Sequence, residues 1–129
     1  MVPVSLNVED FAVTTSKSRD MLNQKELIDY RSQREEFIRW LIYLGKDPEM
    51  AEGYSRDTID KTAYRTEQLN RWVWSQQCGY TMALTHTHAN EYMQDLLYSD
   101  TSSSHKGNTQ KSIKRFFKFL THVTSCYWD

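Results

Sequence analysis

Apolar residues recur at intervals of three and four positions in several stretches of this chain, and that spacing places them on one side of an α-helix. A first helix is predicted from about Gln24 to Leu44, with Gly45 as its cap and Pro48 as a stop. A second is predicted to follow the N-cap residue Ser55 and to reach Ser75 or Gln76. The apolar positions of the second helix are Ile59, Ala63, Thr66, Leu69 and Val73.

Two more helices follow in the second half of the chain. Thr85 or Thr87 is expected to cap the third, which stops near Ser99–Asp100. The fourth is predicted from Ser104 to Thr124. Its apolar stripe, which predicts that Phe116 and Phe117 are buried, consists of Ile113, Phe116, Phe117, Leu120 and Thr124.

These segments predict an all-α fold, a bundle of four to five helices. The low content of turn-forming residues, four Gly and two Pro, favours helices over a turn-rich sheet. Residues 1–23 show no period and are expected to form an irregular arm. The helical domain is predicted for residues 24–124, and residues 125–129 are expected to be a tail that leads to a C-terminal domain absent from this sequence.

Charge is distributed unevenly, although the net charge is only −1. From Gln77 to Asp100 there are three acids and no Lys or Arg, whereas residues 101–129 hold five basic residues and only Asp129. At ~100° per residue, Lys111, Lys114, Arg115 and Lys118 share the side of their helix opposite the apolar stripe. Such a face can simply be solvated surface. However, solvated helices usually mix charges of both signs, so the absence of acids favours a polyanionic partner.

Other kinds of chemistry find little support in the sequence. His86 and His88 are two positions apart, which points their rings roughly 160° apart on a helix, so we expect no metal site. Cys78 and Cys126 are too isolated for a zinc motif and are expected to be free thiols. There is no catalytic motif and no long apolar run, so we expect no cofactor, small-molecule substrate or membrane segment, and a cytoplasmic location.

The order and spacing of several motifs resemble the core-binding domain of tyrosine recombinases, the phage-integrase family, and especially integrases from halophilic archaea. The resemblance covers about residues 24–124. Its positions are Leu69, Trp72 and Trp74, then Thr85, Ala89, Tyr92, Met93 and Leu96, then Ser104, Asn108, Ile113, Phe116, Phe117, Phe119 and Leu120.

The resemblance implies a SAM-like helical domain that clamps double-stranded DNA at a recombination site, with the second and fourth helices facing the DNA. Other recombinase protomers could then bind the same site, and the bound protein would be associated with the nucleoid. The expected DNA-binding residues are Arg56, Lys61, Arg65, Lys106, Asn108, Thr109, Lys111, Lys114, Arg115 and Lys118. Asn108 and Thr109 are the candidates for base edges, because short polar side chains at a helix start can enter a groove.

The sequence departs from the family in two ways. In the family a separate domain cuts DNA with a set of residues that includes a His-x-x-Arg motif, and no histidine here has Arg at the third following position. This chain is therefore expected to bind DNA without cleaving it. In addition, the aromatic residue expected four positions before Leu69 is found one position early, at Tyr64.

Two other functions stay open at this point. The chain could be a helical protein–protein adaptor that uses an aromatic face around Trp40, Trp72 and Trp128. It could also be a truncated regulator that binds DNA and blocks a full-length recombinase. Salt-dependent binding to a duplex would separate both DNA-binding functions from the adaptor.

Overall fold

The computed structural model describes residues 6–43, 53–100 and 102–128, and within these ranges the regular elements are all helical. This confirms the all-α class. The elements are η1 (Val8–Asp10), α1 (Ser16–Asp20), α2 (Gln24–Tyr43), α3 (Arg56–Gln76), α4 (His86–Leu97) and α5 (Ser103–Trp128).

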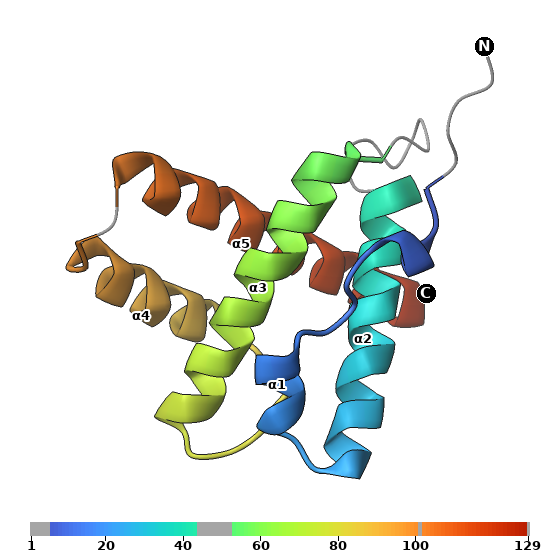
Figure 1. Ribbon diagram of the computed structural model, residues 1–129, viewed down its shortest axis with the longest axis horizontal. Coiled ribbons are helices and arrows are strands. Elements are labelled where there is room, and N and C mark those ends of the chain that lie inside the picture. Colours follow the sequence, from blue (N-terminus) through green and yellow to red (C-terminus); the bar gives the residue numbers. More distant parts are fainter. Residues whose placement is uncertain (1–5, 44–52, 101, 129) are drawn as a thin grey trace.

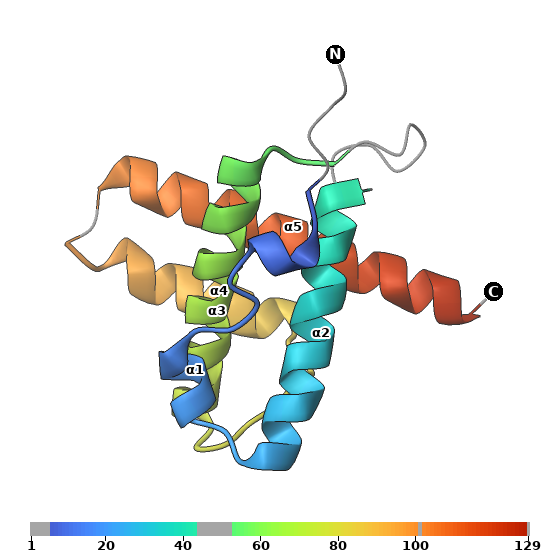
Figure 2. The same cartoon turned by 45° about the vertical axis from the view of Figure 1, so that its right-hand side comes forward.

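Helix α3 is the centre of the arrangement (Figure 1). It crosses α5 with its N-terminal half and α4 further along, and its most extensive contact is with α5. Helices α4 and α5 run side by side in opposite directions, as the rotated view in Figure 2 also shows. Helix α2 lies on the other side of α3, and the segment with η1 and α1 runs along α2 and α3.

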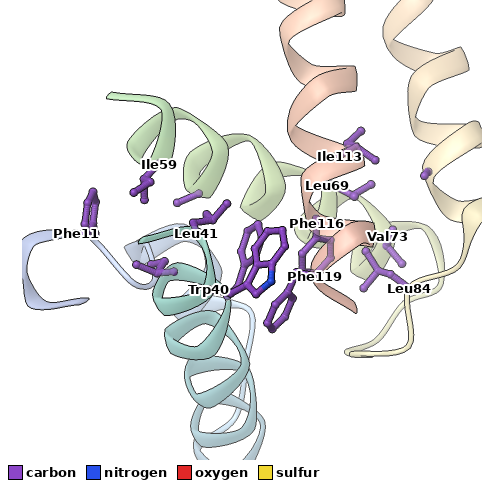
Figure 3. Packing of buried hydrophobic residues seen from close by; sticks show 14 residues of the cluster. Phe11, Trp40, Leu41, Ile59, Leu69, Val73, Leu84, Ile113, Phe116 and Phe119 are labelled. Carbon is purple, nitrogen blue, oxygen red and sulfur yellow. The ribbon is translucent and has the colours of Figure 1, made fainter. Parts of the chain in front are cut away.

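A cluster of aromatic rings joins α2 to α5 in the core (Figure 3). Phe37 lies 5.1 Å from both Phe116 and Phe119, measured between ring centroids, and Trp40 lies 5.9 Å from Phe119. The apolar side predicted for the second helix is buried as expected: Ile59, Ala63, Thr66, Leu69 and Val73.

The apolar side of α5 is rotated from the one predicted. Phe116 is fully buried, as expected, but Phe119 is buried in place of Phe117, which is only half-buried. The reason is the position of the two neighbouring helices. Helix α2 covers the side of α5 that carries Phe119, whereas α4 contacts the side of Phe117 through His86, whose ring stacks on Phe117 at 4.6 Å.

The segment before α2 belongs to the folded unit, so the boundary predicted at residue 23 does not correspond to a break in packing. Phe11 is buried in the core and Ser18 is fully buried. The buried carboxylate of Glu67 on α3 accepts hydrogen bonds from the Thr15 backbone N–H at 3.1 and 3.2 Å. Helices of three and five residues are too short to show a period, which is why the sequence pattern predicts an irregular arm here.

Buried polar side chains connect α2 to α3. The guanidinium of Arg34, which is fully buried, donates to Thr66 Oγ1 at 2.9 Å and to the Ala63 carbonyl at 2.7 Å. The Tyr30 hydroxyl donates to Glu67 Oε1 at 3.2 Å. Burial raises the pKa of Tyr30 to about 12, so this hydroxyl stays protonated, and remains a donor, even in alkaline solution.

Most of the predicted helix ends are found where expected. Ser55 caps α3, its Oγ accepting from the Thr58 N–H, and Thr85 caps α4. The expected Gly45 cap and Pro48 stop, and most of the connector that follows, lie outside the described residues. Helix α5 continues to Trp128, so residues 125–128 are helical and not a tail.

The C-terminal end of α3 carries an unfavourable backbone conformation. Cys78 has a φ of 56°, in the left-handed region that glycine adopts without steric cost. The following Gly79 donates its N–H to the Trp74 carbonyl at 3.0 Å, which closes the end of the helix. A non-glycine residue in this region costs roughly 1–2 kcal/mol.

Replacing Cys78 with glycine should therefore stabilise the protein. Glycine also loses more chain entropy on folding, by roughly 0.5–1 kcal/mol, so we expect a net gain of about 0.5–1 kcal/mol in the free energy of unfolding. Urea denaturation of the Cys78→Gly variant checks this, with Cys78→Ala as the control that retains the strain. A Cys78→Gly variant less stable than Cys78→Ala would contradict this assignment.

Candidate nucleic-acid interface

The crossing of α3 and α5 brings half of the ten predicted DNA-binding residues to one place. A pocket of about 210 Å³ opens between the two helices, and we call it the basic pocket. It is lined by Asp57, Thr58, Lys61 and Arg65 of α3 and by Asn108, Lys111 and Arg115 of α5. Four cationic side chains thus face a single carboxylate, a balance that favours an anionic ligand.

Arg115 is the most firmly placed of these cations. Its Nη1 donates to Thr62 Oγ1 at 3.0 Å, and its guanidinium carbon lies 4.9 Å from the centroid of the Tyr54 ring. Thr62 itself is fully buried. Neither Thr62 nor Tyr54 was predicted as a functional residue, because their contact with Arg115 spans more than fifty positions in sequence and leaves no local pattern.

Lys61 is only partly neutralised. It pairs with Asp57 one helical turn earlier, at 3.0 Å. Both side chains are largely exposed, at 57% and 76%, so solvent screens the pair and an anion can compete for the ammonium group. The sequence signal for Asp57 was available, since an acid four positions before a lysine on a helix commonly pairs with it.

The basic face of α5, which we define as Lys111, Lys114, Arg115 and Lys118, extends beyond the pocket. Lys114 and Lys118 are exposed, and by helical phase they lie within about 60° of Lys111. The Lys118 ammonium group is 6.0 Å from the Trp40 ring centroid. The pocket and this face together place positive charge along α5 from Lys111 to Lys118.

Two predicted residues are directed elsewhere. Arg56 donates to the Asp10 carbonyl at 3.3 Å and lies over the Phe11 ring, so it contacts the N-terminal segment. The Lys106 ammonium group donates to the Leu97 carbonyl at 2.9 Å, at the C-terminal end of α4. A cation there satisfies a terminal carbonyl and complements the helix dipole. Neither residue lines the basic pocket.

The expectation that Thr109 reaches a base edge is wrong, because its side chain is 1% exposed. Thr109 precedes Ile113 by four positions and Phe116 by seven, which places it on the buried side of α5. Asn108, one position earlier, is exposed and lines the basic pocket. Of Asn108 and Thr109, only Asn108 therefore remains a candidate for contact with a base edge.

A larger hollow of about 440 Å³ lies between α2 and the N-terminal segment, but its charges are mixed. Arg31 pairs with Glu35 at 3.2 Å, and Arg19 donates to the Thr14 carbonyl at 2.9 Å. Glu9 lines the hollow as well. We therefore place the candidate interface at the smaller basic pocket, where cations converge and only Asp57 opposes them.

The histidines of α4 have structural contacts. His88 Nδ1 accepts from the Thr85 backbone N–H at 3.1 Å, and His86 stacks on Phe117. Within the described ranges, no three His, Cys, Asp or Glu side chains gather as metal ligands do. None of the described helices is both long and apolar enough to cross a membrane.

Among known proteins, no family model matches the chain, and neither a curated protein nor a solved structure is similar enough to count as a match.

Proposed function

We propose that this chain binds double-stranded DNA through the basic pocket and the basic face of α5. The observation that carries the proposal is the convergence of Lys61 and Arg65 from α3 with Lys111 and Arg115 from α5 around one pocket. Like charges clustered on neighbouring helices repel one another, and a bound polyanion relieves this repulsion by neutralising them.

We further propose that the domain acts as the core-binding domain of a tyrosine recombinase. The support is the motif resemblance, together with the agreement between two separate arguments. Charge alone selects α5, and the family pattern selects the helices that correspond to α3 and α5. In this role the domain holds a recombination site in position and does not itself cleave DNA. The protein would be cytoplasmic, and associated with the nucleoid when bound to DNA. Neighbouring recombinase protomers on the same DNA would be its protein partners.

Binding would work mainly through phosphates. Lysine and arginine neutralise backbone phosphates and release condensed counterions, which supplies affinity without sequence information. Asn108 is the candidate for base readout, because an amide can both donate to and accept from an adenine edge in the major groove. A regulator that blocks a full-length recombinase would use the same contacts, so it differs from this proposal in its partner and not in its DNA surface.

The adaptor alternative loses part of its surface. Trp40 is only 5% exposed and belongs to the core, while Trp72 is half-buried against Tyr92. The side chain of Trp128 lies outside what the structure describes. A shared aromatic docking face built on Trp40 and Trp72 therefore has little support.

Replacing Lys111 with alanine should weaken duplex binding by a similar factor on every sequence, because a phosphate contact carries no base information. The slope of log affinity against log salt concentration should become shallower by roughly 0.9. Fluorescence anisotropy with a labelled duplex at several salt concentrations measures both quantities. Lys25→Ala, an exposed lysine on α2, is the control and should leave the slope unchanged.

Replacing Asn108 with alanine should instead change sequence preference. We expect the salt slope to stay constant, because no charge is removed, while discrimination between duplexes falls by about 1–3 kcal/mol at one base pair. Selection of bound duplexes from a random pool, with the wild type and the variant in parallel, tests this. Identical selected sequences would assign Asn108 a role outside base readout.

A further inference from the structure

The basic pocket is small, and its size and charge suit a single anionic group. Its volume of about 210 Å³ lies below the roughly 300–1,000 Å³ typical of sites for drug-sized molecules. The charged residues that line it are four cations and one acid, Asp57. A phosphate group combines this small size with the required negative charge and with oxygens that accept several hydrogen bonds.

One cation in this pocket is held in place by the fold. Arg115 comes from α5, its hydrogen-bond acceptor Thr62 comes from α3, and the ring beneath its guanidinium comes from Tyr54. Within the described residues, the bond to Thr62 is the one hydrogen bond of this guanidinium. An arginine has five N–H donors in a planar fork, so most of them remain for a ligand.

The position of Tyr54 is itself fixed by the end of α2. The Tyr54 N–H donates to the Leu41 carbonyl at 2.9 Å. The preceding Gly53 passes so close to α2 that a Cβ atom there would overlap the carbonyl of Ile42. This close approach requires glycine, and it brings the Tyr54 ring to the place where it supports Arg115.

The lysines of the pocket lack such support. Lys61 pairs with an exposed Asp57, and Lys111 is exposed. Their ammonium groups on flexible stems lose side-chain entropy when they bind, whereas Arg115 is already ordered. A pre-organised donor contributes more to affinity than a mobile charge does, because less entropy is lost on binding.

We propose that Arg115 is the principal ligand of one phosphate group of the DNA backbone in the basic pocket, and that Thr62 and Tyr54 are positioning residues for Arg115. The other cations of the pocket, Lys61, Arg65 and Lys111, neutralise neighbouring phosphates of the same duplex. This inference rests on the proposed function, since it places one phosphate of the bound duplex. The proposed phosphate contact differs from a general charge contact, because its strength depends on the shape of the guanidinium fork and not only on its charge.

The Arg115→Lys variant separates the two cases because it keeps the charge. A mobile charge contact predicts unchanged binding, whereas a positioned fork predicts a loss of about tenfold in duplex affinity, from the hydrogen bonds that lysine cannot reproduce. The salt slope should stay the same, since the number of neutralised phosphates is unchanged. Arg39→Lys on α2, an exposed arginine outside the pocket, is the matched control and should bind like the wild type.

The Thr62→Val variant tests the positioning role. It keeps the side-chain shape and removes the acceptor, and we expect an affinity loss of roughly three- to tenfold with Arg115 present. In the Arg115→Lys background the same change should have no further effect, because coupled residues are not additive. Additive losses would overturn the positioning role, and circular dichroism of each variant verifies that the fold is retained.

The source of the phosphate is tested by NMR of the Arg115 Nε–Hε resonance. At a DNA concentration near the wild-type Kd, the duplex should shift this resonance in the wild type and shift it less in Thr62→Val. Inorganic phosphate that saturates the shift at concentrations as low as those of the duplex would assign the pocket to a free phosphorylated ligand and overturn the proposal. Wild-type binding without any salt dependence would instead reject DNA binding itself, which keeps the two failures distinguishable.

Discussion

Replacing Phe116 with alanine should lower the free energy of unfolding by about 3–5 kcal/mol, the usual range for deleting a buried aromatic ring. Phe116 has no exposed surface, and its ring packs edge-on against Phe37 with 5.1 Å between centroids. It also lies 6.4 Å from Phe119, within the cluster that joins α2 to α5. Its deletion leaves a cavity between two helices that the remaining rings cannot fill. Urea denaturation followed by far-UV circular dichroism measures the loss.

Phe117→Ala provides the matched comparison, since it removes the same ring from the next position. Phe117 is half-buried and rests on His86, so we expect a smaller loss of about 1–2 kcal/mol. This ordering distinguishes the observed packing from the one that the sequence pattern predicts, in which both residues are equally buried. Equal losses for the two variants, or a larger loss for Phe117→Ala, would contradict the orientation of α5 and with it the direction of its basic face.

The sequence predicted those features that depend on neighbouring residues. The buried side of α3 follows from apolar spacing within one helix, and Ser55 was recognisable as a cap because its hydroxyl bonds an N–H only three residues away. The basic side of α5 was visible for the same reason. Each of these features is determined by the helical period and by local hydrogen bonding.

Features that depend on contacts between distant segments could not be predicted in this way. The rotation of α5 toward Phe119 depends on where α2 lies. The burial of Thr109 differs, because its spacing to Ile113 and Phe116 was already visible in the sequence. The N-terminal segment is held by Glu67, more than fifty positions away. The support of Arg115 by Tyr54 has the same origin, so the residue that we propose as the principal phosphate ligand looked like one cation among several.

Removing all four cations of the basic pocket should remove most of the electrostatic part of DNA binding, with Lys114 and Lys118 retained. In the variant Lys61→Ala, Arg65→Ala, Lys111→Ala and Arg115→Ala, the slope of log affinity against log salt should become shallower by roughly 3.6, or ~0.9 for each lost phosphate contact. At ~0.1 M salt this corresponds to a loss of roughly a thousandfold or more in affinity. Far-UV circular dichroism should show the helical content of the wild type, since Lys61 and Lys111 are exposed and Arg65 and Arg115 are half-buried.

A control variant should remove the same charge from another part of the molecule. Lys17, Lys25, Arg31 and Arg39 are exposed residues of α1 and α2, and none of them lines the basic pocket. Their replacement by alanine changes the net charge by the same four units. Any effect of overall charge on DNA binding is therefore equal in the two quadruple variants.

The salt dependence of duplex binding, measured in parallel for the wild type and these two folded variants, tests the central claim most directly. We predict a steep slope for the wild type, a slope close to it for the α1–α2 variant, and a slope shallower by roughly 3.6 for the basic-pocket variant. A basic-pocket variant that is folded and keeps the wild-type slope and affinity would contradict the claim that α3 and α5 form a DNA-binding surface.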